Sequence, residues 1–219
     1  MASSIVHLAV TDELIKRHDF SDTNRLRFGS VIPDAGSKEA SHLKVSIMDG
    51  RMKTYDLDRF RAMYGERMLT DDLYLGYYLH LVQDALYRHF VYDRYHWDPN
   101  PPGNIEKLHN DYSTVNFYVV KKYGLVNDLN VPNGFEQEDI NRLCVFDVER
   151  FMSEIAAYFL PAAGEPIFFF TKEMSDEFIA EAAKYCSEEI RKLRNGDSGM
   201  DMTEYAWSRA GDLVVNHTQ

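Results

Sequence analysis

Apolar residues recur every three or four positions along most of the chain, and this period predicts amphipathic α-helices. Thr54 or Asp56 is the expected N-cap of the second helix, which Gly65 ends, and Thr70 is the expected N-cap of the third. Acidic residues follow Thr70 in the first turn, where the helix dipole favours negative charge. The full set of predicted helices covers residues 5–20, 54–65, 70–95, 105–124, 136–160 and 171–196.

The helical period breaks over residues 21–55. Within this segment, the stretch "GSVIPDAGSKEASH" contains Pro33, two glycines and several small polar residues, a composition that predicts a long irregular loop. Residues 97–104, "WDPNPPGN", end the long third helix. Residues 166–170, "PIFFF", fit either a short strand or a buried corner.

Together these patterns predict an all-α fold, a multi-helix bundle of about five to seven helices with a long loop between the first helices. Residues 1–219 are expected to form a single domain. Residues 210–219 are expected to be a docked turn followed by a loose tail. A loop as long as the first one is usually functional or disordered in a compact helical domain.

Charge narrows the classes of partner. Acidic residues (35) outnumber basic ones (24), which gives a formal net charge of −11. Such a chain would repel a duplex phosphate backbone unless basic residues clustered, and the basic stretches "KKYG" and "IRKLR" are short. We therefore expect a small anionic molecule as substrate rather than nucleic acid, with a bound cation supplying positive charge.

The chain has only two cysteines, Cys144 and Cys186, whose spacing fits neither a secreted disulfide framework nor a metal site. The first residues lack the basic region of a signal peptide, and Asp12 and Glu13 interrupt their apolar run. No stretch reaches the roughly 18 apolar residues of a membrane span, and no basic amphipathic helix suited to a bilayer surface is evident. The expectation is a cytoplasmic protein without stable membrane association.

His80 and Asp84 lie one helical turn apart in the apolar stretch "GYYLHLVQDAL". Apolar stripes flank them, so this helix is expected to be surrounded by the core. A buried charge must be paired or must coordinate a metal, because isolated burial is costly. A histidine and a carboxylate at positions i and i+4 form a preorganised pair of ligands for a divalent ion. The simpler alternative is a His–Asp hydrogen bond inside the core.

Three further residues have side chains suited to the same ion. Asp34, in "VIPDAG", and His42, in "ASHL", lie in the long loop among small residues that let the backbone approach a ligand closely. His7 lies on the apolar side of the first helix. Each also has an ordinary interpretation: Asp34 as a turn residue, His42 as a surface residue and His7 as a core histidine.

In this order, "IVHLAV", "GSVIPDAG", "ASHLKV" and "LGYYLHLVQDAL" resemble the zinc-dependent phospholipase C family. That family has a helical bundle fold that binds a cluster of zinc ions and hydrolyses phosphodiesters. The later half of the chain resembles small bacterial members of the group more than the secreted phospholipases. The resemblance implies that Asp34, His42 and His80 ligate one ion, that Asp84 bridges to a second, and that His7 ligates the second.

The chain also departs from the family pattern. Secreted members ligate zinc with a processed N-terminal residue, whereas no signal peptide is expected here. A third zinc site in the family uses a His-x-x-x-Glu pair on a later helix, but here Ser113 follows His109 at that spacing. His109 and Asp111 are the candidates for a replacement ligand, and Asp111 is the better one, because a polar face continues around it. His89 lies about 140° around the helix from Asp84 and is expected to face elsewhere.

The expected function is a metal-dependent hydrolase of a phosphoester, with zinc or another divalent transition metal. Asp34 is the candidate catalytic residue, since a carboxylate beside the ions can orient or deprotonate water. One alternative is a helical protein that binds metal or a small ligand without catalysis. Another is a phosphohydrolase of the HD type, whose adjacent pair would be His18 and Asp19. Solvent access to the ligands would separate an enzyme from a closed site.

Overall fold

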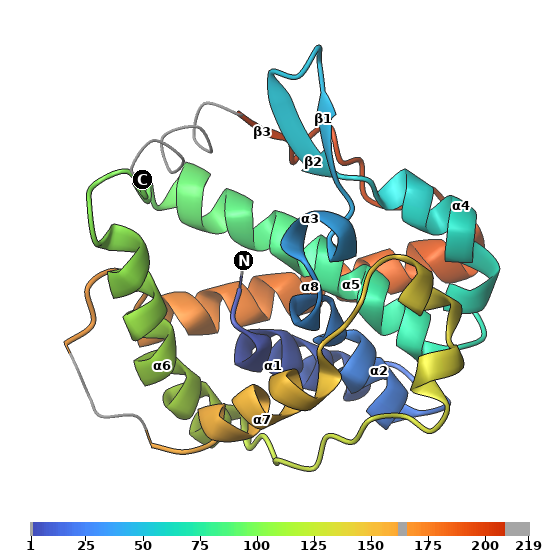
Figure 1. Ribbon diagram of the computed structural model, residues 1–219, viewed down its shortest axis with the longest axis horizontal. Coiled ribbons are helices and arrows are strands. Elements are labelled where there is room, and N and C mark those ends of the chain that lie inside the picture. The colour runs from blue at the N-terminus through green and yellow to red at the C-terminus, as the bar shows by residue number, and fades with distance from the viewer. Residues whose placement is uncertain (1, 162–165, 209–219) are drawn as a thin grey trace.

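The computed structural model describes residues 2–161 and 166–208 and is mainly helical (Figure 1), which confirms the predicted fold class in its main feature. The expected C-terminal turn and tail lie outside the described residues. A small antiparallel sheet in the order β1-β2-β3 was not predicted. The elements are α1 (Ser4–Ile15), α2 (Thr23–Gly29), α3 (Lys38–Ser41), β1 (Lys44–Ile47), β2 (Met52–Tyr55), α4 (Leu57–Met68), α5 (Asp72–Arg88), α6 (Asn104–Tyr123), α7 (Val148–Tyr158), α8 (Lys172–Asn195) and β3 (Trp207–Ser208).

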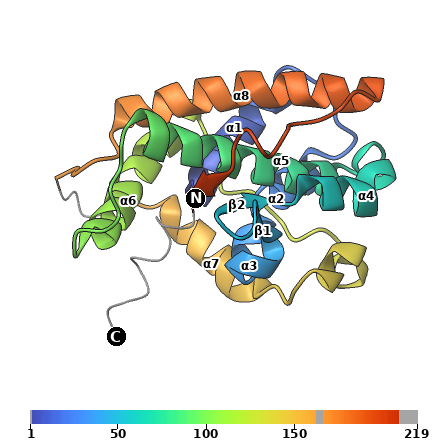
Figure 2. The ribbon, with the colours of Figure 1, turned by 90° about the horizontal axis from the view of Figure 1, so that it is seen from above.

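Helix α5 runs through the middle of the molecule, with α8 on one side of it and α3 and α7 on the other (Figure 2). Every residue from Leu73 to Ala85 is buried, as the flanking apolar stripes predicted. The N-cap is Asp71 rather than Thr70, and its side chain accepts a hydrogen bond from the backbone N–H of Leu73 at 3.0 Å. The core therefore surrounds the helix that carries the His-x-x-x-Asp pair.

Helix α2 crosses α5 in direct backbone contact, because a glycine on each helix faces the other. A Cβ atom at Gly76 would lie 2.2 Å from the carbonyl oxygen of Leu26, and one at Gly29 would lie 2.2 Å from that of Leu73. A side chain at either position would push the two helices apart. The contact places Ser30, directly after α2, beside α5.

The prediction of one long loop over residues 21–55 is wrong, because most of these residues form helices and strands. Asp22 caps α2, a 3₁₀ turn (Ile32–Ala35) and α3 follow, and β1 and β2 then form a hairpin that pairs Lys44 with Tyr55. Helix α2 has 7 residues and α3 has 4, too few for a helical period to be visible in the sequence.

The later helices follow the sequence pattern with two differences. Helices α6 and α8 end at Gly124 and Gly196, whose φ angles of 68° and 77° suit glycine. Gly65 does not end α4, which begins after its N-cap Asp56 and continues beyond the glycine. The predicted helix over 136–160 is regular only in its second half, as α7, and short 3₁₀ turns precede it.

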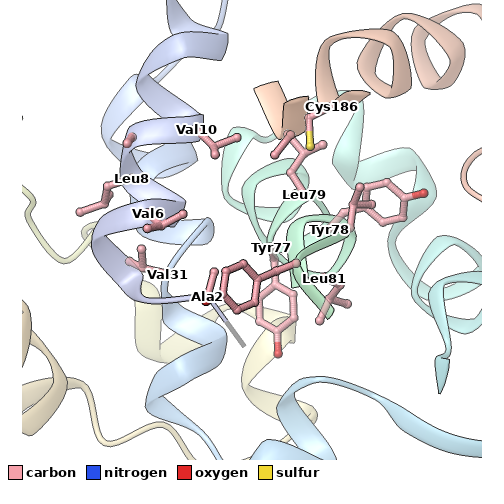
Figure 3. Packing of buried hydrophobic residues seen from close by; sticks show 14 of the residues in the cluster. Ala2, Val6, Leu8, Val10, Val31, Tyr77, Tyr78, Leu79, Leu81 and Cys186 are labelled. Carbon is pink, nitrogen blue, oxygen red and sulfur yellow. The ribbon is translucent and has the colours of Figure 1, made fainter. Parts of the chain in front are cut away.

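One continuous cluster of buried apolar side chains joins these helices. Figure 3 shows part of it, with Val10 of α1, Leu79 of α5 and Cys186 of α8. Cys144 and Cys186 are both free thiols, and Cys186 is buried. Among the helices that the structure describes, none is both long enough and apolar enough to cross a bilayer.

Candidate metal centre

His80 lies on α5 near the point where α2 crosses it, and it is fully buried. Its Nδ1 atom is 2.9 Å from the carbonyl oxygen of Ser30. A carbonyl oxygen only accepts hydrogen bonds, so the Nδ1–H group of His80 must be the donor. The helix contact that the two glycines permit therefore leaves Nε2 of the neutral ring as a bare lone pair.

His42 follows α3 directly and is also fully buried. Its Nδ1 atom is 2.8 Å from Oγ of Ser41, and that hydroxyl donates its one hydrogen to the carbonyl oxygen of Ser37 at 2.9 Å. The hydroxyl must therefore accept from Nδ1–H of His42, which again leaves Nε2 without a hydrogen. The Nε2 atoms of His42 and His80 face each other at 3.1 Å.

His7 reaches the same place from α1. Its Nδ1 atom is 2.9 Å from Oε1 of Gln83, and its ring stacks on that of His80 with centroids 4.1 Å apart. With the amide oxygen as acceptor, Nδ1 carries the hydrogen and Nε2 is free. This Nε2 atom lies 3.4 Å from Oδ1 of Asp84 and has no hydrogen-bond partner among the described residues.

Asp84 is fully buried between the histidines. Its Oδ1 atom accepts a hydrogen bond from the backbone N–H of Ala2 at 3.0 Å and lies near His7. Its Oδ2 atom lies 3.4 Å from Nε2 of His42 and 3.8 Å from Nε2 of His80. The two carboxylate oxygens therefore face different histidines.

Asp34 lies in the 3₁₀ turn before α3. Its Oδ2 atom accepts a hydrogen bond from Oγ of Ser4 at 3.2 Å. Its Oδ1 atom is 3.7 Å from Nε2 of His42 and 4.0 Å from Nε2 of His80. The side chain is 13% exposed, whereas those of the other four are 0% exposed, so Asp34 is the member of the cluster in contact with solvent.

The five residues form two overlapping groups that could each hold a metal ion. In each group, the potential ligand atoms lie within 4.8 Å of one another. His80 belongs to both groups, but only its Nε2 atom is free, so it can ligate one ion at a time. The first group is His7, His80 and Asp84, and the second is Asp34, His42 and His80.

Burial and the neighbouring charges set the protonation states of the cluster. Burial, followed by the effect of His7, lowers the pKa of His80 to about 3. Burial disfavours the charged form of Asp84, but the neighbouring imidazole rings of His42 and His7 outweigh it and hold the pKa of Asp84 well below its usual value. The pKa of Asp34 is lowered in the same way, chiefly by His42. Burial lowers the pKa of His42, but the carboxylates of Asp34 and Asp84 raise it by more, so the net shift is upward. Both carboxylates are therefore ionised at neutral pH.

A cation fits this arrangement better than hydrogen bonds alone. When His42 and His80 are both neutral, their facing Nε2 atoms are two lone pairs, and only a proton or a cation removes the repulsion. Among the described residues, Oδ1 of Asp34 and Oδ2 of Asp84 are buried without a hydrogen-bond donor. Mixed histidine and carboxylate ligation suits zinc, manganese or iron.

A cavity of about 470 Å³ opens beside the cluster. Its lining includes Ala2, Ser4 and Asp34, together with Tyr112 of α6 and Tyr158 of α7. The three histidines of the cluster and Asp84 are not among its lining residues. A small molecule can therefore approach the cluster from the side of Asp34.

Asp111, predicted as a replacement ligand, has another role in the structure. Its carboxylate accepts hydrogen bonds from the backbone N–H groups of Phe168, Phe169 and Phe170 at 2.7 to 2.8 Å. These bonds hold residues 166–170 as an irregular corner, not as a strand. A carboxylate committed to three donors has little capacity left for a metal, and Asp111 joins neither group of potential ligands among the described residues.

The other histidines that the structure describes lie outside the cluster. Nε2 of His18 is 2.6 Å from Oγ of Ser187, and neither His18 nor Asp19 belongs to a group of potential metal ligands among the described residues. His89 faces away from Asp84, as predicted, and is 58% exposed beside Asp93. His109 lines the cavity.

Sequence reasoning missed the groups that orient the ligands. Gln83 had a visible signal, because it is a polar residue beside Asp84 in the same apolar stretch. Ser30 had none, since it acts through its backbone carbonyl, which every residue type carries. Ala2 likewise acts through its backbone N–H.

Comparison with known proteins adds no assignment: the chain matches no family model and no curated protein, and the structure matches no solved structure.

Proposed function

We propose that the protein is a metal-dependent hydrolase of phosphoesters, of the kind found in the zinc-dependent phospholipase C family. The observation that carries the proposal is the cavity of about 470 Å³ that reaches Asp34 at the edge of an otherwise buried set of ligands. A purely structural metal site has no need of such access.

The ligand geometry suits two ions. Asp34, His42 and His80 would hold one of them, together with Oδ2 of Asp84, and His7 with Oδ1 of Asp84 would hold the other. Bound there, the ions would supply positive charge for the phosphate oxygens and a water molecule of lowered pKa. The opposed contacts of the two Asp84 oxygens support the bridging role that the family resemblance implies.

Asp34 is the proposed catalytic residue. It lines the cavity, and its lowered pKa, set by His42 against the effect of burial, keeps it ionised at neutral pH. The hydroxyl of Ser4 holds Oδ2, and Oδ1 has no donor among the described residues. The carboxylate can therefore orient a water molecule beside the ions and accept its proton.

Hydrolysis of p-nitrophenyl phosphate and bis-p-nitrophenyl phosphate by zinc-reloaded protein tests the proposal. We expect turnover that a chelator abolishes and zinc restores, and a loss of roughly 100-fold or more in kcat for Asp34→Asn. Asp93→Asn is the control, because Asp93 is an exposed acid that forms an i+4 pair with His89 outside the cluster. This substitution should leave kcat unchanged. The absence of turnover by the loaded wild type, or equal turnover by Asp34→Asn, would overturn the proposal.

One observation favours a second candidate, a non-catalytic metal-binding protein. His7, His42, His80 and Asp84 are all fully buried, as ligands of closed sites usually are. Retention of the metal with no turnover in the same assay would select this candidate.

A further inference from the structure

The cavity beside the cluster has a chemistry of its own that the metal ligands do not explain. Two of its lining residues are basic, Lys38 of α3 and His109 of α6, although the chain as a whole has a net charge of −11. We propose that this cavity binds an organic phosphomonoester with an aromatic or other planar group, and that Lys38 selects the monoester. The inference rests on the proposed function, which places the phosphorus atom of the ligand beside the metal cluster. It adds the class of substrate.

The side chain of Lys38 is available to bind a ligand, because no acidic residue among those described pairs with it. It lies between Asp34 and His42 in the sequence, on the short helix that joins two of the potential ligands. It lines the cavity and forms no ion pair with an acidic residue in the described part of the chain. An ammonium group with free donors at the mouth of a cavity is suited to a phosphate oxygen.

His109 lines the same cavity as Lys38, near enough for the charge of the lysine to act on it. Partial burial lowers the pKa of His109 first, and the charge of Lys38 lowers it further. His109 is therefore a neutral hydrogen-bonding group at neutral pH, beside an ammonium group. Together the two side chains offer donors to an oxygen atom that points away from the buried cluster.

The acidic residues of the cavity do not cancel this positive charge. Asp34 is turned toward the histidines, and Glu154 is held by Arg150, whose Nη1 donates to it at 2.6 Å. A negative ligand therefore meets Lys38 without a competing carboxylate in hydrogen-bond contact with that lysine among the described residues.

A count of phosphate oxygens favours the monoester over the diester. A phosphodiester has two unesterified oxygens and one negative charge, and both oxygens would be used at the cluster. A phosphomonoester has a third unesterified oxygen and close to two negative charges at neutral pH. Lys38 and His109 provide a partner for that third oxygen.

The residues that line the cavity indicate which organic group is esterified to the phosphate. A cavity of about 470 Å³ holds far more than a phosphate group, and aromatic rings make up much of its lining. Such rings favour stacked or edge-on contacts with another planar group. The rings are those of Tyr92, Trp97, Tyr112, Phe151 and Tyr158.

Calorimetric titration of non-hydrolysed analogues tests the inference without turnover. Phenylphosphonate represents an aromatic monoester, methylphosphonate a monoester without the ring, and diphenylphosphinate, with two free oxygens and one charge, an aromatic diester. We expect zinc-loaded wild type to bind phenylphosphonate more tightly than either of the others. Lys38→Ala should raise the Kd of phenylphosphonate roughly tenfold and leave that of diphenylphosphinate nearly unchanged.

Two further variants make the result specific. Lys16→Ala removes the same charge from an exposed lysine that pairs with Glu13 on α1 and does not line the cavity, so it should bind like wild type. Lys38→Arg should keep most of the affinity. Zinc content and melting temperature should be equal in all variants, because Lys38 is exposed and alanine is a good helix former.

The outcomes separate this inference from the proposed function. Tight binding of phenylphosphonate that depends on Lys38, without hydrolysis of any phosphoester, would support the inference and refute the hydrolase. Hydrolysis of phosphoesters, together with binding of diphenylphosphinate as tight as that of phenylphosphonate or with no effect of Lys38→Ala, would support the hydrolase and refute the inference. No binding of phenylphosphonate by zinc-loaded wild type would also refute it.

Discussion

The Nε2 atoms of His42 and His80 lie 3.1 Å apart in the core, although neither ring carries a hydrogen on that nitrogen when it is neutral. The carbonyl of Ser30 fixes one hydrogen on Nδ1 of His80, and the committed hydroxyl of Ser41 fixes the other on Nδ1 of His42. Two lone pairs at this distance require a positive charge. A divalent ion would satisfy both rings and also the carboxylate oxygens that have no donor.

Asp84→Asn is expected to abolish metal retention and phosphoester hydrolysis together. The substitution removes the one charge that lies near all three histidines of the cluster. Metal content and kcat should be measured on the same preparation, with Asp93→Asn as the control at an exposed i+4 acid. Activity that survives in Asp84→Asn would exclude the two-ion arrangement.

Gly76→Ala is expected to destabilise the protein and to weaken metal binding. The new Cβ would meet the carbonyl oxygen of Leu26 at 2.2 Å, so α2 must move and carry Ser30 away from His80. Overpacking of this kind costs about 1 to 3 kcal/mol in the free energy of unfolding.

Gly65→Ala is the matched control for this prediction. It lies inside α4 with no atom within 4 Å of an added Cβ, so the substitution should stabilise by about 0.5 to 1 kcal/mol. Urea unfolding of the metal-free proteins checks both signs. Equal stability of the two variants would show that the close crossing of α2 and α5 does not exist.

The affinity for zinc is expected to rise with pH across the neutral range. Asp34 and Asp84 raise the pKa of His42, so its proton must leave before Nε2 can ligate a metal. His80 adds no dependence there, because burial lowers its pKa to about 3 and the ring is already neutral. Zinc competition titrations at pH 6, 7 and 8 check this direction. An affinity that falls or stays constant would mean that His42 is not a ligand.

Asp111→Asn is expected to reduce stability without loss of metal. The carboxylate accepts three backbone hydrogen bonds from Phe168 to Phe170, and an amide leaves part of them unsatisfied at a cost of about 1 to 3 kcal/mol. Unfolding experiments and metal analysis of the same sample check the two halves of the prediction. Loss of metal with normal stability would restore Asp111 as a ligand of a third site.

The sequence predicted the long helices because their apolar period extends over several turns. Helices α5, α6 and α8 were found in this way, with the glycine stops of α6 and α8. The elements within residues 21–55 were not, because each is too short to show a period and α2 is held by the tight glycine contact with α5. Contacts between segments distant in sequence leave no local pattern.

The potential metal ligands were more predictable than the groups that orient them by hydrogen bonds. His80 and Asp84 stood out because polar groups in an apolar helix need a partner, and the family resemblance then singled out His7, Asp34 and His42. The backbone carbonyl of Ser30 has no signature in a sequence. The polar face around Asp111 was visible, but its three backbone donors belong to a segment that only the fold brings near.

Metal content of protein purified without chelator or affinity metal shows whether the His–Asp cluster holds an ion. His80→Ala should be compared with wild type and with the control His89→Ala. His89 and Asp93 have the same i+4 spacing as His80 and Asp84, but they form an exposed pair just after α5. Wild type and His89→Ala should each carry about one to two equivalents of a divalent transition metal, and His80→Ala should carry almost none. No metal in wild type, even after reloading with zinc, would contradict the claim and leave the cluster as a set of buried hydrogen bonds.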